Sequence, residues 1–174
     1  MSNAWERYYA IRKLAYEAAE ITLSEVYGLP VQLTEIGDDA LEAFEEHWLH
    51  HPYRRYDWEW RDVVESWENR PSHFEVAIWC NSYLSGLAVG KVSDGKLVLS
   101  IYLLEGSPVE THPLKGLVRF CVVEAAEAYA TILGCDELHL RQPVDGALPL
   151  YFDMGFFLAT NQANVVVCSK ELNR

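Results

Sequence analysis

The sequence has no long apolar segment, no internal repeat and no low-complexity region. A membrane-spanning helix needs about 18 or more consecutive apolar residues, so none is predicted. The N-terminus also lacks a basic segment followed by an apolar core, and we therefore expect no signal peptide. These absences predict a cytoplasmic protein that does not associate with membranes.

Cysteine is scarce and is never arranged as Cys-x-x-Cys. The chain has four cysteines, namely Cys80, Cys121, Cys135 and Cys168. Three of them lie in apolar stretches predicted to be strand or helix. Thiolate metal sites and redox motifs use closely spaced pairs, which are missing here. We expect buried thiols in a reducing compartment.

Positive charge is also in short supply. The chain has 14 Lys and Arg against 26 Asp and Glu, a formal net charge of −12. Nucleic-acid binding relies on Lys and Arg contacts to phosphates, so it is not predicted. The acidic balance instead favours an amine-bearing small molecule or a basic protein surface as partner.

What the chain has is enough apolar residues for one core. Half of its 174 residues are hydrophobic and 13% are aromatic. This length and composition are typical of a single globular domain, which we assign to residues 1–174.

Three helices are predicted in the first third of the chain. The first covers 4–27, and Gly28 ends it. The second lies near 39–50 with Asp38 as N-cap, and the third near 58–68 with Asp57 as N-cap. The expected buried face of the first helix is Trp5, Tyr8, Ile11, Leu14, Ala18, Ile21 and Val26.

The remaining chain is predicted to alternate strands with helices. A short strand begins at Val31, and a turn at Asn81-Ser82 and a reversal at Ser93–Lys96 divide an antiparallel meander. We expect the Asp-Gly pair of that reversal to supply its positive φ angles. A helix separates the next strand from the meander, so that strand should pair in parallel. The predicted elements are strands 74–80, 83–92 and 97–104, helix 114–133, strand 137–141, a helix near 146–154, and a hairpin of 156–159 and 164–169.

Two motifs follow the meander. Leu114-Lys115-Gly116-Leu117-Val118 opens the long helix, where free backbone N–H groups and the helix dipole favour an anion. Glycine at this place lets the backbone approach a phosphate closely. The second motif is Ala147-Leu148-Pro149-Leu150-Tyr151-Phe152-Asp153-Met154-Gly155-Phe156, in which Gly155 ends a short helix.

The order of elements and these two motifs resemble the GCN5-related N-acetyltransferase superfamily over about residues 30–170. The resemblance implies an α/β (α+β) fold, with a mixed, mostly antiparallel central sheet flanked by helices. The helix over 4–27 would be an addition at the N-terminus. It further implies an N-acetyltransferase that uses acetyl-CoA, or another acyl-CoA, to acetylate an amine.

The resemblance also implies roles for individual residues. Tyr151 matches the tyrosine that can protonate the departing thiolate of the cofactor. Glu105, at the end of the strand before the loop, is the first candidate for the general base, with Glu110 and His112 as alternatives. The residues implied in cofactor binding are Leu114, Lys115, Gly116, Leu117, Val118 and Arg119.

An alternative hypothesis is a catalytically inactive protein of the same fold that binds a protein partner. Pro113 stands where the family has Arg or Gln, and it removes one N–H donor. Val118 stands where a small residue is usual, and its methyl groups would crowd the phosphates. Val144 stands where the family has Asn.

The aromatic segment after the second helix is a candidate contact surface for a substrate or a partner. It offers Tyr53, Tyr56, Trp58 and Trp60, whose rings can hold a cation or an apolar group. Its helical spacing does not let Trp58 and Trp60 both face one core. The chain can also form a homodimer, through the first helix or the last hairpin.

His47 and His51 are four residues apart on a predicted helix. Pro52 follows at once, and the neighbouring sequence has no further Cys or His ligand outside this short segment. A zinc site needs three or four ligands, so no metal is predicted.

Overall fold

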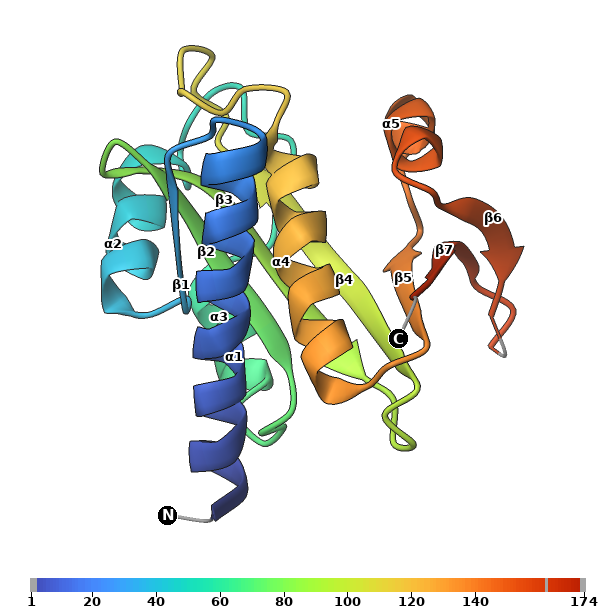
Figure 1. The fold of residues 1–174 in the computed structure, drawn as a ribbon. Helices are drawn as coiled ribbons and strands as arrows, with labels where there is room; N and C mark the ends of the chain where they lie inside the picture. The colour runs from blue at the N-terminus through green and yellow to red at the C-terminus, as the bar shows by residue number, and fades with distance from the viewer. Residues whose placement is uncertain (1–2, 162, 173–174) are drawn as a thin grey trace.

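The computed structural model describes residues 3–161 and 163–172. Within them the strands form one seven-stranded sheet in the order β1-β2-β3-β4-β5-β7-β6, antiparallel except for β4 and β5 (Figure 1). The strands are β1 (Val31–Thr34), β2 (Phe74–Cys80), β3 (Tyr83–Val92), β4 (Val98–Gly106), β5 (Glu137–Arg141), β6 (Phe157–Thr160) and β7 (Val166–Glu171).

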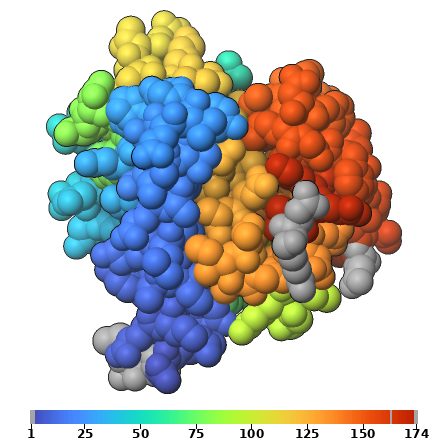
Figure 2. All heavy atoms as spheres, in the orientation of Figure 1, coloured from blue at the N-terminus to red at the C-terminus, as the bar shows by residue number. Residues whose placement is uncertain are grey.

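Helices cover both faces of this sheet. On one face α1 (Asn3–Ile21) packs against α4 (Val118–Leu133), and their chains run side by side at the surface (Figures 1 and 2). On the other face lie α2 (Asp38–His47) and α3 (Trp60–Ser66). Each pair of helices encloses its own apolar cluster against the sheet. The shorter segments are η1 (Thr22–Val26), η2 (Asp145–Ala147) and α5 (Leu148–Asp153).

The strands β4 and β5 separate halfway along β4. Their parallel pairing ends at Ile101 and Leu140, although β4 continues to Gly106. Tyr102 is an extra residue in β4 at this point, because Val89 pairs with Leu103 while Gly90 pairs with Ile101. Such a bulge bends a strand and increases its twist. The carboxyl ends of β4 and β5 therefore diverge.

The bulge requires close backbone contact at Gly90. A Cβ atom on this residue would lie 2.6 Å from the carbonyl oxygen of Ser100. We expect Gly90→Ala to lower the free energy of unfolding by about 1–3 kcal/mol, because neither backbone can yield without disturbing the bulge. Urea denaturation measures this loss. Gly146→Ala is the control, since a Cβ there meets nothing within 4 Å, and equal stability of both variants would contradict the prediction.

The predicted order of elements is confirmed, as are the parallel pairing of β4 with β5 and the extra N-terminal helix. The Asn81-Ser82 turn is also confirmed, with both residues at positive φ. All four cysteines are buried, as expected. No helix in the described ranges is long and apolar enough to cross a membrane.

The predicted buried face of α1 is largely wrong. Four of its residues are exposed, namely Leu14, Ala18, Ile21 and Val26. The helix instead buries Arg12 and Tyr16, because carbonyl oxygens in β2 and in the loop just before it accept their hydrogen bonds. Arg12 donates to the carbonyl oxygens of Pro71 and His73, and Tyr16 donates to that of Glu75. Polar residues with such partners can replace apolar ones in a core.

Three helix starts and one turn also differ from the predictions. Gly37 and Glu59 are the N-caps of α2 and α3, in place of Asp38 and Asp57. The long helix begins at Val118 instead of 114, because Gly116 adopts a φ of +82° that no helix accommodates. In the reversal at 93–96 the positive φ belongs to Lys96, not to the Asp-Gly pair.

Candidate functional site

Two adjoining cavities lie where β4 and β5 diverge. The outer one, of about 450 Å³, is bounded by residues 53–56, by 104–110 and by the start of α4. The inner one, of about 250 Å³, lies between the ends of β4 and β5. Tyr56, Leu104 and Arg119 line both cavities. We refer to the pair as the groove.

The N-terminus of α4 opens on the outer cavity. No side chain caps this helix, and its first hydrogen bond runs from the Cys121 N–H to the Leu117 oxygen at 3.1 Å. The preceding N–H groups therefore have no partner within the helix. Lys115 and Gly116 lie directly before it and line the same cavity. Free N–H groups, a helix dipole and a lysine together form a setting suited to a phosphate group.

The six residues predicted to hold a cofactor take different positions. Lys115, Gly116, Val118 and Arg119 line the outer cavity, whereas Leu114 is buried in the core and Leu117 is outside the groove. Val118 packs against the sheet beside the outer cavity. It is only 7% exposed, and a Cβ atom on Gly86 would lie 2.5 Å from its Cγ1. Gly86 thus makes room for the valine within the sheet.

Glu105 lies on β4 with its carboxylate fully engaged. Arg54 donates from Nε to Oε2 at 2.8 Å and from Nη2 to Oε1 at 3.1 Å, and Trp60 Nε1 donates to Oε1 at 2.8 Å. The side chains of Glu105 and Arg54 are 1% and 5% exposed. That Glu105 acts as the general base stays a prediction. Its hydrogen bonds to Arg54 and Trp60 favour a different role, in which Glu105 positions the segment that carries Arg54.

Tyr151 lies in α5 and lines the inner cavity. Its ring meets that of Phe156 with centroids 6.0 Å apart. Burial raises the pKa of the Tyr151 phenol above its ordinary value, and the neighbouring Arg119 guanidinium only partly opposes this shift. The phenol therefore keeps its proton at neutral pH, as a proton donor must.

His112 lies in the loop before α4 and lines the outer cavity with Glu110. Burial and the neighbouring Lys115 lower the pKa of His112, so the imidazole is neutral at pH 7. Its Nδ1 is buried without a hydrogen-bond partner in the described chain. The sequence named His112 only as an alternative base, and the structure places it at the groove with a free nitrogen.

No family model matches the sequence, and no curated protein does either. Solved structures are similar in fold. Against the ribosomal-protein-S18-alanine N-acetyltransferase of Escherichia coli the TM-score is 0.61 at 15% identity, over 83% of this chain and 95% of that one. A GNAT-family acetyltransferase of Staphylococcus aureus gives 0.59 at 12% identity, over 82% and 99%. The PaiA N-acetyltransferase of Thermoplasma acidophilum, in complex with coenzyme A, gives 0.51 at 16% identity, over 81% and 98%.

This chain has the GNAT fold. The predicted fold class, a mixed and mostly antiparallel sheet flanked by helices with a further helix at the N-terminus, is thereby confirmed.

The aromatic residues predicted to contact a substrate divide into two groups in this GNAT-fold chain. Tyr53 is 63% exposed at the outer cavity. Tyr56 and Trp58 line the inner cavity and stack with ring centroids 4.3 Å apart. The prediction for Trp60 is wrong, because this side chain is fully buried and its indole N–H is bonded to Glu105.

The groove also contains hydrogen-bond donors without acceptors. Trp58 Nε1 and Arg141 Nε are buried, line the inner cavity and have no partner within the described chain. Buried donors are nearly always satisfied, so such a pair points to a ligand or ordered water. Sequence reasoning missed Arg141, whose guanidinium carbon lies 4.2 Å from the centroid of the Tyr102 ring. A charged residue at the end of a parallel strand was the only available signal.

The histidine pair of the α2 region contacts aromatic rings. The His47 ring stacks on the Tyr83 ring with centroids 6.1 Å apart. The centroids of the His51 and Tyr53 rings are 5.6 Å apart. Across residues 3–161 and 163–172, no three His, Cys, Asp or Glu side chains gather as a metal site would need.

Proposed function

We propose that this protein is an acyl-CoA-dependent N-acyltransferase that acts on an amine-bearing acceptor. The observation that carries the proposal is the uncapped N-terminus of α4, with Lys115 and Gly116, opening on a groove between diverging strands that holds Tyr151. The coenzyme A complex of the similar PaiA structure supports the choice of cofactor.

The groove fits the chemical groups of an acyl-CoA. The pyrophosphate would be held by Lys115 and by the N–H groups that begin α4. The unpartnered donors Trp58 Nε1 and Arg141 Nε suit the oxygen atoms of an amide or a thioester. When bound, acetyl-CoA supplies an acyl group activated as a thioester.

Two of the chain's own groups would handle protons. Tyr151 would donate the proton that it holds on Oη to the departing thiolate of the cofactor. A base that accepts the proton of the amine is needed as well, and we retain Glu105 as the predicted base with Glu110 and His112 as its alternatives. The neutral imidazole and free Nδ1 of His112 favour it over the fully hydrogen-bonded Glu105 carboxylate.

The acceptor is proposed to be cationic before reaction. The net charge of −12 attracts amines and basic protein surfaces over distances comparable with the Debye length. Tyr53, Tyr56 and Trp58 at the groove can contact such a group through their rings. A small amine and a basic protein both satisfy this description.

Isothermal titration with acetyl-CoA tests the proposal. We expect saturable one-to-one binding, which Lys115→Ala weakens roughly fivefold to tenfold, because the variant loses a charge beside the pyrophosphate. The affinity of the unmodified protein should fall as salt is added. Absence of heat at millimolar acetyl-CoA would rule out the proposed function.

The control for this titration is Lys13→Ala, which removes an exposed lysine of α1 outside the groove. It should bind acetyl-CoA as the unmodified protein does, although the net charge changes equally. The alternative of an inactive protein that binds a partner stays a prediction. Failure of both proteins to bind acetyl-CoA would favour it.

A further inference from the structure

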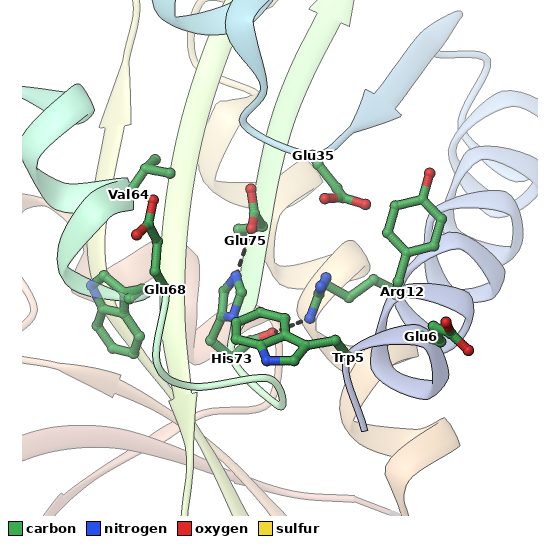
Figure 3. Close-up of a pocket in the computed structure, with 10 residues that line it drawn as sticks. Trp5, Glu6, Arg12, Glu35, Val64, Glu68, His73 and Glu75 are labelled. Carbon is green, nitrogen blue, oxygen red and sulfur yellow. Dashed lines mark hydrogen bonds and ion pairs between the residues drawn. The ribbon is translucent and has the colours of Figure 1, made fainter. Parts of the chain in front are cut away.

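A separate cavity of about 630 Å³ lies near the β1 edge of the sheet, between α1, α3 and the start of β2 (Figure 3). It forms because β1 is short and pairs only with residues 77–80 of β2. Residues 74–76, at the start of β2, therefore have no strand beside them on this side. None of the residues that line this cavity lines the groove.

The walls of the cavity are apolar and aromatic. Trp5 and Tyr9 come from α1, and Trp67 follows α3 on the opposite side. His73 meets the Trp5 ring edge-on, with centroids 6.3 Å apart. Aromatic faces attract cations, and a volume of this size is in the range of small-molecule sites.

Carboxylates outnumber cations in the lining. Glu75 is already bonded, to His73 Nε2 at 2.5 Å and to the Ile36 N–H at 2.6 Å. Within the described ranges, no hydrogen bond or ion pair joins the side-chain carboxylate of Glu35 or of Glu68 to another residue. Figure 3 shows these two carboxylates reaching the cavity from different elements, while Glu6 points away.

Glu35 is the carboxylate most in need of a cation. It is half-buried in the loop after β1, and burial together with the nearby Glu75 charge raises its pKa. Burial and the Glu75 charge both disfavour the ionised form of Glu35. A positively charged ligand group beside the carboxylate would stabilise that form. The charges of Arg12, His73 and Lys13 oppose this rise in pKa only in part, and the hydrogen bonds that Arg12 donates go to the Pro71 and His73 oxygens.

Arg12 gives a second sign of a ligand. The residue is 3% exposed and lines the cavity, yet its buried Nε–H has no acceptor in the described chain. An acceptor atom on a bound molecule, or an ordered water retained beside an amine that has no such atom, would satisfy it.

We propose that this cavity binds a protonated organic amine with an apolar body. The ammonium group lies by Glu35, Glu68 adds negative charge from the α3 side of the cavity, and the apolar body lies between Trp5 and Trp67. None of the residues of this site belongs to the groove, so the proposal does not rest on the proposed acyl transfer.

The test is titration with 2-phenylethylammonium in the absence of acyl-CoA, followed by calorimetry and by tryptophan fluorescence, in which the Trp5→Ala variant identifies the part of the signal that comes from the cavity. We expect one-to-one saturable binding, with a dissociation constant of about 0.1–1 mM for a ligand of this size. The neutral 2-phenylethanol and the anionic 3-phenylpropanoate should bind at least roughly tenfold more weakly.

Glu35→Gln and Trp5→Ala should each weaken binding of 2-phenylethylammonium roughly fivefold or more. Glu65→Gln, an exposed glutamate of α3 outside the cavity, should not. If Glu35→Gln fails to fold, the exposed Glu68→Gln takes its place. Non-saturable titration to about 10 mM, equal binding of the anion, or unchanged binding by folded Glu35 or Glu68 variants would each overturn the proposal.

Lys115→Ala separates this proposal from the proposed function. It lies in the groove, so it should lose affinity for acetyl-CoA but keep its affinity for 2-phenylethylammonium. Amine binding without acetyl-CoA binding would leave the cavity assignment standing while removing the acyltransferase assignment. The opposite result would remove only the cavity assignment.

Discussion

Replacing Tyr151 by phenylalanine is expected to slow acyl transfer roughly 100-fold or more, while acetyl-CoA binding changes by no more than about twofold. The phenol is 5% exposed in the inner cavity, and its raised pKa keeps the proton on Oη. Phenylalanine fills the same space but has no proton to donate. Release of free thiol from acetyl-CoA, with a panel of primary amines and basic peptides as acceptors, measures the rate.

The pH profile gives this prediction a second readout. The protonated phenol is the donor, so a raised pKa keeps the donor form present beyond the ordinary value of 10.0. Tyr151 should therefore cause no loss of rate between pH 7 and 9, and any Tyr151-dependent decline above that range should vanish in the variant. Tyr83→Phe removes a phenol outside the groove and serves as control. A Tyr151→Phe protein of full activity would exclude the acid role but not acyl transfer.

Truncating Glu105 to alanine is expected to lower the free energy of unfolding by about 3–5 kcal/mol. The variant would leave the Trp60 indole N–H buried without an acceptor, and the buried Arg54 guanidinium would keep only its hydrogen bond to the Trp58 carbonyl oxygen. Removing one partner of a buried ion pair costs far more than the pair itself contributes, because the remaining charge is unsolvated. Chemical denaturation followed by circular dichroism measures the loss.

The exposed pair of Arg61 with Glu45 is the matched control for Glu105→Ala. Its atoms are 2.6 Å apart, but the side chains are 46% and 33% exposed. Solvent screens such a pair, so Glu45→Ala should lose much less stability than Glu105→Ala. Arg54→Ala should resemble Glu105→Ala, and the double variant should lose less than their sum. A Glu105→Ala protein that is fully stable yet inactive would instead support the role as base.

Local sequence patterns predicted the order of helices and strands, and the resemblance to a known superfamily implied the fold class. The turns at Asn81-Ser82 and Ser93–Lys96 divided the strands of the meander, and Gly28 marked the end of the first helix, where it adopts a positive φ. The motifs around Lys115 and Tyr151 placed the candidate site at the start of α4 and at α5. Both residues do line the groove. Turns, helix ends and short motifs depend on residues that are adjacent in the chain, so they can be predicted from the sequence alone.

The tertiary structure alone decided which side chains are available. Glu105 is bonded to residues 51 and 45 positions away, and Val118 is turned into the sheet by the space at Gly86. Arg12 is buried because distant carbonyl groups accept its bonds. The residue type determines which hydrogen bonds a side chain can donate or accept and how much apolar surface it can bury. Which partner it meets depends on packing between elements far apart in the chain, and no local pattern specifies that packing.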